Sequence, residues 1–594
     1  MKERKDIDKQ YTWDLEVIYS SNKDLDRDYD KAKKLIKELS GYEDKMIDNS
    51  DNFYNTICLS FEIERLIDKL YSYANLSFDL DTSNNKCQEL CERVSNLHND
   101  YVKASYFIVP SILKCDKEVI DRYYEEEPKL REYETSINDI YRYKEHTLSD
   151  KEEKILSSMG KIMGNAYDTY ELFKDCEMSF GKIKDENDKR VELTNSNYSL
   201  YIESKDRRVR KSAFKGLYKE YKKYSNTFAS LLSTNMKELT TMARVSNYNS
   251  AIERSLYADD VNIEVYDNLI DSVHSNIGYI YDYYRLKKEI LGLHELHLYD
   301  IYVPIVHDYD KKYSYEEAKD IILKVLSVFG EEYVNKVKEA LDSRWIDVYP
   351  TKNKRTGGYS GGSYDTYPYI LLNYQDKYND MSTLIHEMGH SMHSYYSRKY
   401  NTYQDSEYRI FAAEVASTVI ELLLSRYMIE HSSSKEEKLF ILNNLMELYR
   451  ATIYRQTMFA EFEKKVSNLI DNDEAVTADK LCDIYYDLNK FYFGNDVVVD
   501  NDIRYEWERI PHFYYDFYVY KYATGLSAAT VIVNNILSGK EGAVEDYIEF
   551  LKCGSKKSPL ESLKIAGVDL TDKSVIDMAL LEFKKVIDMY RDNI

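Results

Sequence analysis

The residues of this chain that could do chemistry are concentrated in one short segment, residues 381–393. Within it, His386, Glu387 and His390 form the pattern H-E-x-x-H. Residues four apart lie on the same face of an α-helix, so both imidazoles can bind one metal ion. A zinc ion lowers the pKa of a water molecule that it binds from about 15.7 towards about 7, and the adjacent Glu387 can accept the proton. The pattern therefore predicts the machinery of a zinc peptidase.

The residues around the motif decide whether it is more than a chance match, because it fixes only three positions. Leu384, Ile385, Met388 and Met392 are apolar at helical spacing, which predicts a buried helix that carries both histidines on one side. The alternative is a pair of core histidines that are hydrogen-bonded to neighbours. That alternative would not explain Glu387.

A catalytic zinc ion usually has three protein ligands, so the two histidines need a third. Glu414 is the candidate, since it lies within the apolar run 410–420, where an ionised carboxylate is costly to bury unless a cation compensates it. Its distance along the chain leaves room for a loop and a second helix to return to the site. A core glutamate in a salt bridge is the alternative. His393 is expected beside the ligands without binding the metal, because the longer pattern H-E-x-x-H-x-x-G-x-x-H is absent.

A second candidate for chemistry lies near the C-terminus, where His512 is followed by a run rich in tyrosine over residues 514–522. Peptide hydrolysis builds negative charge on the carbonyl oxygen, and hydroxyl or imidazole donors aimed at that oxygen lower the barrier. Aromatic packing alone could explain the tyrosines. It would not explain a histidine placed just before them.

The elements that must position these residues are mostly helices. Residues 1 to about 175 show successive amphipathic periods, and residues 176–204 contain a short hairpin pattern that marks a lobe boundary. Residues 357–362 hold four of the 19 glycines and precede a β-type run, residues 367–374, in which Pro368 favours the start or edge of a sheet. An edge strand beside a metal site could bind an extended peptide through backbone hydrogen bonds. A structural hairpin with a mobile glycine loop is the alternative.

Composition limits the class of protein. The 594 residues include only 19 Gly and 7 Pro, which favours a mainly helical fold of two or three lobes. A net charge of −23 disfavours binding to nucleic acid or to an anionic membrane. The seven scattered cysteines predict reduced thiols, and neither a signal peptide nor an 18-residue apolar run is found. A cytoplasmic location is therefore expected.

Three ordered motifs make the chain similar to a known family. They are H-E-M-G-H at residues 386–390, A-E-V-A-S around Glu414, and P-H-F-Y-x-x-F-Y-V-Y-K-Y-A-T-G at residues 511–525. Together they resemble the oligoendopeptidase F branch of the thimet-oligopeptidase-like zinc peptidases. The resemblance implies a mainly α, clam-shaped zincin with a small β-sheet near the active site and a deep channel between lobes. It covers residues 200–590 for the catalytic part, with a weaker helical N-terminal match.

The resemblance also implies roles for particular residues. His386, His390 and Glu414 would bind one zinc ion per chain, and Glu387 would be the base. His512, Tyr515 and Tyr522 would contact the substrate and stabilise the oxyanion. Tyr518 and Tyr520 are the alternatives for the tyrosine positions, because the segment is shorter here than in the thimet oligopeptidases.

We therefore expect an N-terminal helical domain at residues 1–195 and a zinc peptidase domain at residues 196–594. The expected activity is hydrolysis of internal bonds in short unstructured peptides. An exopeptidase of the peptidyl-dipeptidase kind and a catalytically silent peptide-binding protein are the alternatives. The sequence does not give the oligomeric state, the side-chain preference or the length limit of the peptide.

Overall fold

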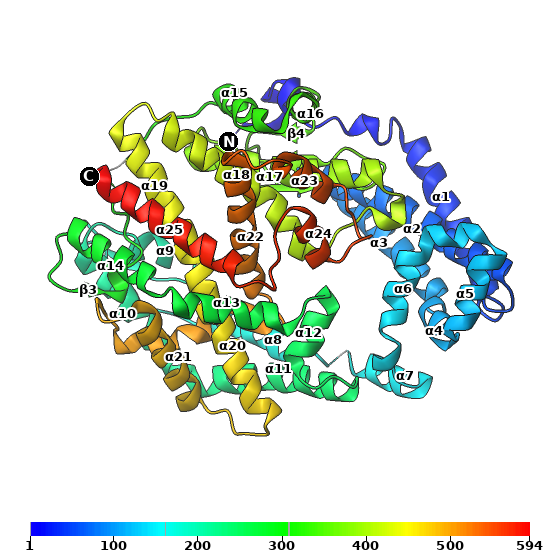
Figure 1. Cartoon of the computed structure of the whole chain (residues 1–594), viewed down its shortest axis with the longest axis horizontal. Helices are drawn as coiled ribbons and strands as arrows, with labels where there is room; N and C mark the ends of the chain where they lie inside the picture. Colours follow the sequence, from blue (N-terminus) through cyan, green and yellow to red (C-terminus); the bar gives the residue numbers. More distant parts are fainter. Residues whose placement is uncertain (1, 161, 307–308) are drawn as a thin grey trace. The chain divides into compact units, whose positions relative to one another are not determined.

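The computed structural model of the chain describes residues 2–160, 162–306 and 309–594, and these form helices with three small sheets (Figure 1). The predicted mainly helical class is confirmed. Two compact units are present, and each is built from three separate segments of the chain. Unit 1 comprises residues 1–147, 310–424 and 532–567, and unit 2 comprises residues 148–309, 425–531 and 568–594. The division into domains at residues 1–195 and 196–594 was expected from the sequence, and it stays a prediction.

Unit 1 begins with a series of helices and continues with the sheet and the helices of the candidate site. Its elements are α1 (Asn22–Leu39), α2 (Ser50–Leu80), α3 (Asn85–Ser105), α4 (Ile108–Lys114), α5 (Lys117–Glu126), α6 (Glu134–Arg142), α15 (Tyr315–Val325), α16 (Glu331–Asp342), β4 (Ile346–Asp347), β5 (Tyr359–Gly361), β6 (Tyr369–Leu371), α17 (Tyr378–Tyr400), residues 410–424 of α18 (Ile410–Glu430), residues 532–537 of α22 (Tyr520–Leu537), α23 (Ala543–Leu551) and α24 (Pro559–Ile565).

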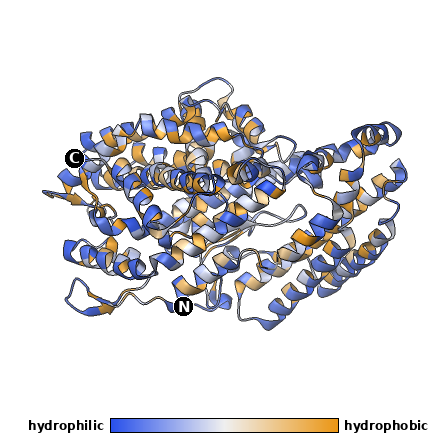
Figure 2. Cartoon of the chain, turned by 90° about the horizontal axis from the view of Figure 1, so that it is seen from below, coloured by the Kyte–Doolittle hydropathy of each residue, from blue (hydrophilic) through white to orange (hydrophobic). Residues whose placement is uncertain are grey.

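Amphipathic periodicity explains the first helices of unit 1. Helix α2 begins after Asn49, whose side chain accepts a hydrogen bond from the backbone N–H of Asn52 and so caps the helix. Along it, Ile63, Ile67 and Leu70 recur at helical spacing and are buried. Figure 2 shows apolar and polar colouring alternating along the ribbons of the helices. Helices α1, α2 and α3 pack against one another through these apolar faces.

The three-stranded sheet of unit 1 has the order β4-β6-β5. Strand β4 pairs parallel to β6, and β5 pairs antiparallel to it with Ser360 opposite Ile370. The predicted β-type run is confirmed as β6, and Pro368 directly precedes its first residue. Strand β6 is central, so Pro368 marks the start of a strand and not an edge strand. The edge strands are β4 and β5, and the glycine-rich segment forms β5. Ser360 Oγ lies 2.8 Å from Ser391 Oγ and so joins this edge strand to α17.

Unit 2 is also mainly helical. Its elements are α7 (Asp150–Met159), α8 (Asn165–Leu172), β1 (Lys182–Lys184), β2 (Arg190–Glu192), α9 (Tyr198–Ile202), α10 (Arg207–Tyr221), α11 (Ser225–Val245), α12 (Ala251–Asp259), α13 (Ile263–Ser275), α14 (Gly278–Ile290), β3 (Leu296–His297), residues 425–430 of α18, α19 (Lys435–Tyr449), α20 (Arg455–Asp471), α21 (Ala478–Phe493), β7 (Val497–Val498), residues 520–531 of α22 and α25 (Ser574–Asp592).

The hairpin predicted within residues 176–204 is confirmed, because β1 and β2 pair antiparallel with Ile183 opposite Val191. Strands β3 and β7 form a second, parallel pair. Of the helices in the described part of the chain, none combines the length and the apolar character needed to cross a membrane.

Candidate active site

Helix α17 carries the H-E-x-x-H motif. Its apolar residues are fully buried, as the spacing predicts: Leu384, Ile385, Met388 and Met392. The side chains of His386 and His390 are only 25% and 19% exposed and project from another side of the same helix. The fourfold spacing therefore places both imidazoles at one site.

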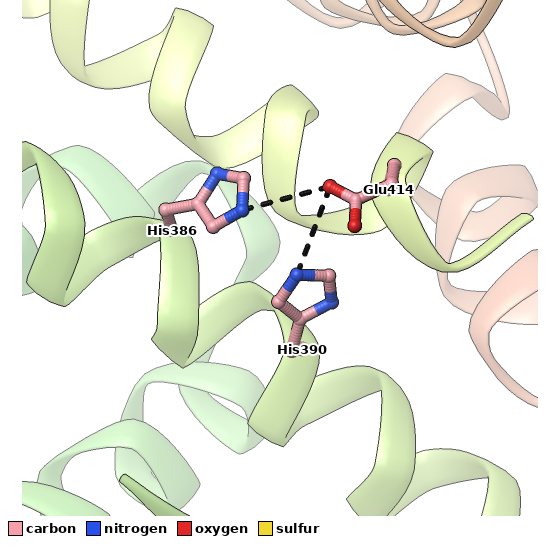
Figure 3. Close-up of side chains that lie close together, drawn as sticks. All are labelled: His386, His390 and Glu414. Atoms are coloured by element: carbon pink, nitrogen blue, oxygen red, sulfur yellow. Dashed lines mark ion pairs between the residues drawn. The ribbon is translucent and has the colours of Figure 1, made fainter. Parts of the chain in front are cut away.

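The third predicted ligand, Glu414, comes from α18 and meets the two imidazoles (Figure 3). Its Oε2 atom lies 3.7 Å from His386 Nε2 and 3.9 Å from His390 Nε2. One possible ligand atom from each residue lies within 4.8 Å of the other two. The structure thus brings together the three residues that the sequence analysis singled out for metal binding.

The reason for which Glu414 was singled out is wrong in part. Its side chain is 42% exposed rather than buried among its apolar neighbours, because it faces an open cavity. Val415 and Ala416, which follow it, are fully buried. The ion pairs of Glu414 within the described residues are with the two imidazoles, so the alternative of a salt-bridged core glutamate is not supported.

Gly389 lets the two site helices approach closely enough for Glu414 to reach the histidines. A Cβ atom added at this position would lie 2.5 Å from Ser417 Cα and 3.1 Å from the carbonyl oxygen of Ala416. Real Cβ contacts are not this short, so any side chain here would push α18 away from α17. The sequence analysis did not assign a role to Gly389, although a glycine inside a buried helix is a signal of close backbone approach.

Glu421, two turns beyond Glu414 on α18, holds His386 in place. Its Oε2 atom lies 3.1 Å from His386 Nδ1, and Ser382 Oγ donates to its Oε1 atom over 2.9 Å. This bond leaves Nε2 of His386 free to face Glu414. Burial lowers the pKa of His386, but the hydrogen bond and charge of Glu421 outweigh it and the net pKa is raised. The sequence analysis missed Glu421, because nothing local marks it.

Glu387 lines the same cavity from the motif. The cavity has a volume of about 330 Å³, and its lining residues are Gly358, Tyr359, Ser360, His386, Glu387, His390, Ser394, Tyr408 and Glu414. Burial raises the pKa of Glu387, while the charge of His386 and a hydrogen bond from the backbone of Ser360 partly lower it. Burial and the charge of His386 lower the pKa of His390 to about 3, so this imidazole is neutral at pH 7. A neutral imidazole is the form that binds a metal.

His393 is not part of the metal-binding cluster. Among the described residues, that cluster consists of His386, His390 and Glu414. Its ring is buried and stacks on Tyr408, with the ring centres 3.6 Å apart and the planes at 8°. Tyr408 in turn lines the cavity, and its hydroxyl lies 2.8 Å from Ser394 Oγ. The predicted place of His393 is thus what the structure shows, and Tyr408 is a cavity residue that the sequence analysis missed.

Comparison with known proteins decides the family. Residues 200–581 match peptidase family M3, and residues 111–180 match the family described as oligopeptidase F. The chain belongs to peptidase family M3. It is therefore a metalloendopeptidase of the oligoendopeptidase F type, and the resemblance stated from its three motifs is confirmed.

Relatives of this M3 peptidase match it over nearly its whole length. Oligopeptidase PepF of Bacillus subtilis (strain 168) is 40% identical over 99% of this chain and 88% of the relative. An oligoendopeptidase F homolog of Lactococcus lactis subsp. lactis (strain IL1403) is 38% identical over 98% and 97%. The solved structure of oligoendopeptidase-F from Enterococcus faecium aligns with a TM-score of 0.74 at 33% identity, covering 96% of this chain and 99% of that one.

The C-terminal residues predicted to contact substrate lie in unit 2 of the M3 peptidase and form their own cluster. The His512 ring lies 5.4 Å from that of Tyr515 and 6.1 Å from that of Tyr522. Tyr515 is 40% exposed, and its hydroxyl lies 2.8 Å from that of Tyr167. Tyr520 is fully buried, which makes it unsuited to bind a substrate. Burial lowers the pKa of His512, so its imidazole is neutral at pH 7.

Proposed function

We propose that this M3 peptidase is a zinc-dependent oligoendopeptidase that hydrolyses internal bonds of short unstructured peptides, with Glu387 as the base. The observation that carries the proposal is the convergence of two imidazole nitrogens and one carboxylate oxygen. Two histidines and a glutamate with an open fourth position are typical of catalytic zinc. Ligand atoms at zinc–ligand distances of about 2.1 Å lie about 3.4 Å apart in a tetrahedral site, and the observed 3.7 and 3.9 Å are close to this.

His386, His390 and Glu414 would hold the ion, one per chain. When bound, zinc would polarise the scissile carbonyl group and make a water molecule easier to deprotonate. Glu387 would accept the proton of the attacking water and later deliver it to the leaving amine. The raised pKa of Glu387 makes its carboxylate a stronger proton acceptor than an ordinary glutamate. A protein that only bound peptides would not need this group in the cavity.

Strand β5 supports recognition of an extended peptide. It is one of the two edge strands of its sheet in the described residues, and Tyr359 and Ser360 line the cavity that contains Glu387. A peptide that lies along this edge would be bound through its backbone, with little regard for sequence. His512, Tyr515 and Tyr522 would contact the substrate and stabilise the oxyanion, as the resemblance implies.

The remaining parts of the proposal concern organisation and location. A helical domain at residues 1–195 and a catalytic domain at residues 196–594 are supported by the two family matches, which fall on either side of this division. Action in the cytoplasm is supported by the seven cysteines, all of which are free thiols. The deep channel between lobes stays a prediction.

The test uses a mixture of short peptides with and without a chelator. The wild-type protein should cleave internal bonds, lose activity with the chelator and regain it with zinc. Glu387→Gln should keep the zinc content and lose cleavage, and Glu541→Gln, at an exposed glutamate, should behave as wild type. Mass spectrometry of the products separates cleavage at internal bonds from release of terminal dipeptides. Full activity of Glu387→Gln would contradict its role as the base.

A further inference from the structure

A second cavity, here called the Arg450 cavity, lies wholly in unit 2. Its volume is about 10 Å³, which is room for a single water-sized sphere. Its lining residues are Tyr284, Arg450, Tyr454, Arg455, Met458, Tyr492 and Phe493. Residues 450–454 form a π-helical turn between α19 and α20. Such turns are rare, and they occur frequently at functional sites.

Arg450 lines this cavity and carries hydrogen-bond donors that no protein acceptor uses within the described residues. Its side chain is only 6% exposed, and its Nε atom donates to Glu447 over 2.8 Å. Within the described residues, its two terminal nitrogens have no protein acceptor. These two atoms are also not among the fully buried side-chain nitrogens, so a small ligand can reach them. The Arg450 guanidinium also lies 5.2 Å from the ring centre of Tyr302. A buried cationic group with unused donors requires a partner.

Two further lining residues of this cavity, Arg455 and Tyr284, also carry unused donors. Arg455 uses its terminal nitrogens for Glu506, at 2.8 and 3.5 Å, and within the described residues its Nε atom has no protein partner. Tyr284 is 3% exposed, and within the same residues its hydroxyl has no hydrogen-bond partner. Burial raises the pKa of Tyr284, and the nearby charges of Arg450 and Arg455 oppose this rise. The hydroxyl therefore stays protonated, and it is close to both guanidinium groups.

The charges around the cavity do not balance. In the ion pairs of the described residues, the guanidinium groups of Arg450, Arg455 and Arg509 share two carboxylates, those of Glu447 and Glu506. Lys287 also contacts Glu447, and it lies near the half-buried Glu203. Lys287 and Glu203 together add no net charge. Glu508, beside Arg509, has a pKa raised to about 9 by burial and is protonated at pH 7. Among these three guanidinium groups and two carboxylates of the described residues, one guanidinium group has no carboxylate of its own, and burying such a charge is costly.

We propose that the Arg450 cavity binds one monovalent, monatomic anion of about the size of chloride. The anion would accept hydrogen bonds from Arg450, Arg455 and Tyr284 and would supply the missing negative charge. A water molecule fits the same space but leaves the charge uncompensated. Tyr284 lies on α14, Arg450 is the first residue of the π-helical turn before α20, and Arg455 is the first residue of α20. The anion would therefore tie α14 to the beginning of α20.

The first experiment measures the melting temperature of the full-length chain in sodium chloride and in sodium gluconate at equal ionic strength. Chloride and bromide should raise it to a saturating limit, as expected for a ligand that binds the folded state. Gluconate is too large for the cavity and should not. Arg450→Met should remove the response to chloride. Arg504→Met, at an arginine of the same unit paired with Asp483, should keep it. Equal responses to both salts, or an unchanged chloride response in Arg450→Met, would overturn the proposal.

The second experiment does not depend on the folding of a variant. Crystals of the wild-type chain are grown with bromide at the concentration that saturates the melting response. An anomalous peak between Arg450 and Tyr284 is the expected result. A cavity that shows only water density under these conditions would overturn the proposal.

Discussion

The contact between Glu421 and His386 leads to a quantitative prediction for metal affinity. A hydrogen bond to a charged group is worth about 1.5–3 kcal/mol and a neutral one about 0.5–1.5 kcal/mol. Glu421→Gln keeps the shape of the side chain and an acceptor for His386 Nδ1, whose distance to Glu421 is 3.1 Å, but it removes the charge. The loss of about 1–1.5 kcal/mol corresponds to roughly tenfold weaker zinc binding. Glu421→Ala removes the support altogether and should approach a 100-fold loss.

The assay is competition for zinc between the protein and a chelator of known affinity. Cobalt-substituted protein provides a second readout, because its visible spectrum reports the ligand geometry directly. The matched control is Glu430→Gln, at an exposed glutamate near the other end of α18. The melting temperature of the metal-free protein should change little in any variant. Wild-type zinc affinity and an unaltered cobalt spectrum in Glu421→Ala would show that Glu421 does not position His386.

Four further predictions follow from the site and the core. Gly389→Ala should destabilise the protein by about 1–3 kcal/mol and weaken zinc binding, because the new Cβ would overlap Ser417; denaturant unfolding and the chelator assay check this. Tyr522→Phe should lower kcat about 10–1000-fold if its hydroxyl stabilises the oxyanion, and steady-state kinetics with unchanged zinc content measure it. Removal of the metal with a chelator should lower the melting temperature and abolish cleavage, and both should return with zinc. Burial raises the pKa of Glu508 to about 9, so the folded state keeps a proton that the unfolded chain loses above about pH 4.5. Stability should therefore fall by up to about 1.4 kcal/mol per pH unit between pH 6 and 8, and Glu508→Gln should flatten this slope in unfolding curves, whereas Glu541→Gln should not.

The helices and the metal-binding residues could be predicted because their signals are local. The fourfold spacing of His386 and His390 and the apolar positions around them are properties of a single helix, and the structure reproduces both. Strand β6 was likewise visible as a β-type run after a proline. Glu414 was found for a partly wrong reason, because its exposure depends on a cavity that only the tertiary structure reveals.

Residues whose role depends on the packing of two helices could not be found in this way. Glu421 lies two turns beyond Glu414 on α18, and only the crossing with α17 brings it to His386. Gly389 matters for the same reason, since the backbone of α18 approaches it. The sequence also did not predict which segments make up each unit, because each unit combines segments that are far apart in the sequence. Periodicity reports which face of an element is buried, but not which element covers it.

Unit 1 is built from three separate segments of the chain, and this has a consequence for folding during synthesis on the ribosome. Helix α18 receives a hydrogen bond from Tyr547, whose hydroxyl donates to the carbonyl oxygen of Ala416 over 3.0 Å, and Asn401 after α17 donates to the carbonyl oxygen of Lys552. Both partners belong to the last segment of unit 1, residues 532–567. The surroundings of the histidine helix are therefore completed only after residues 532–567 have left the exit tunnel. A nascent chain that ends before residue 532 would carry the H-E-x-x-H motif without these two hydrogen bonds.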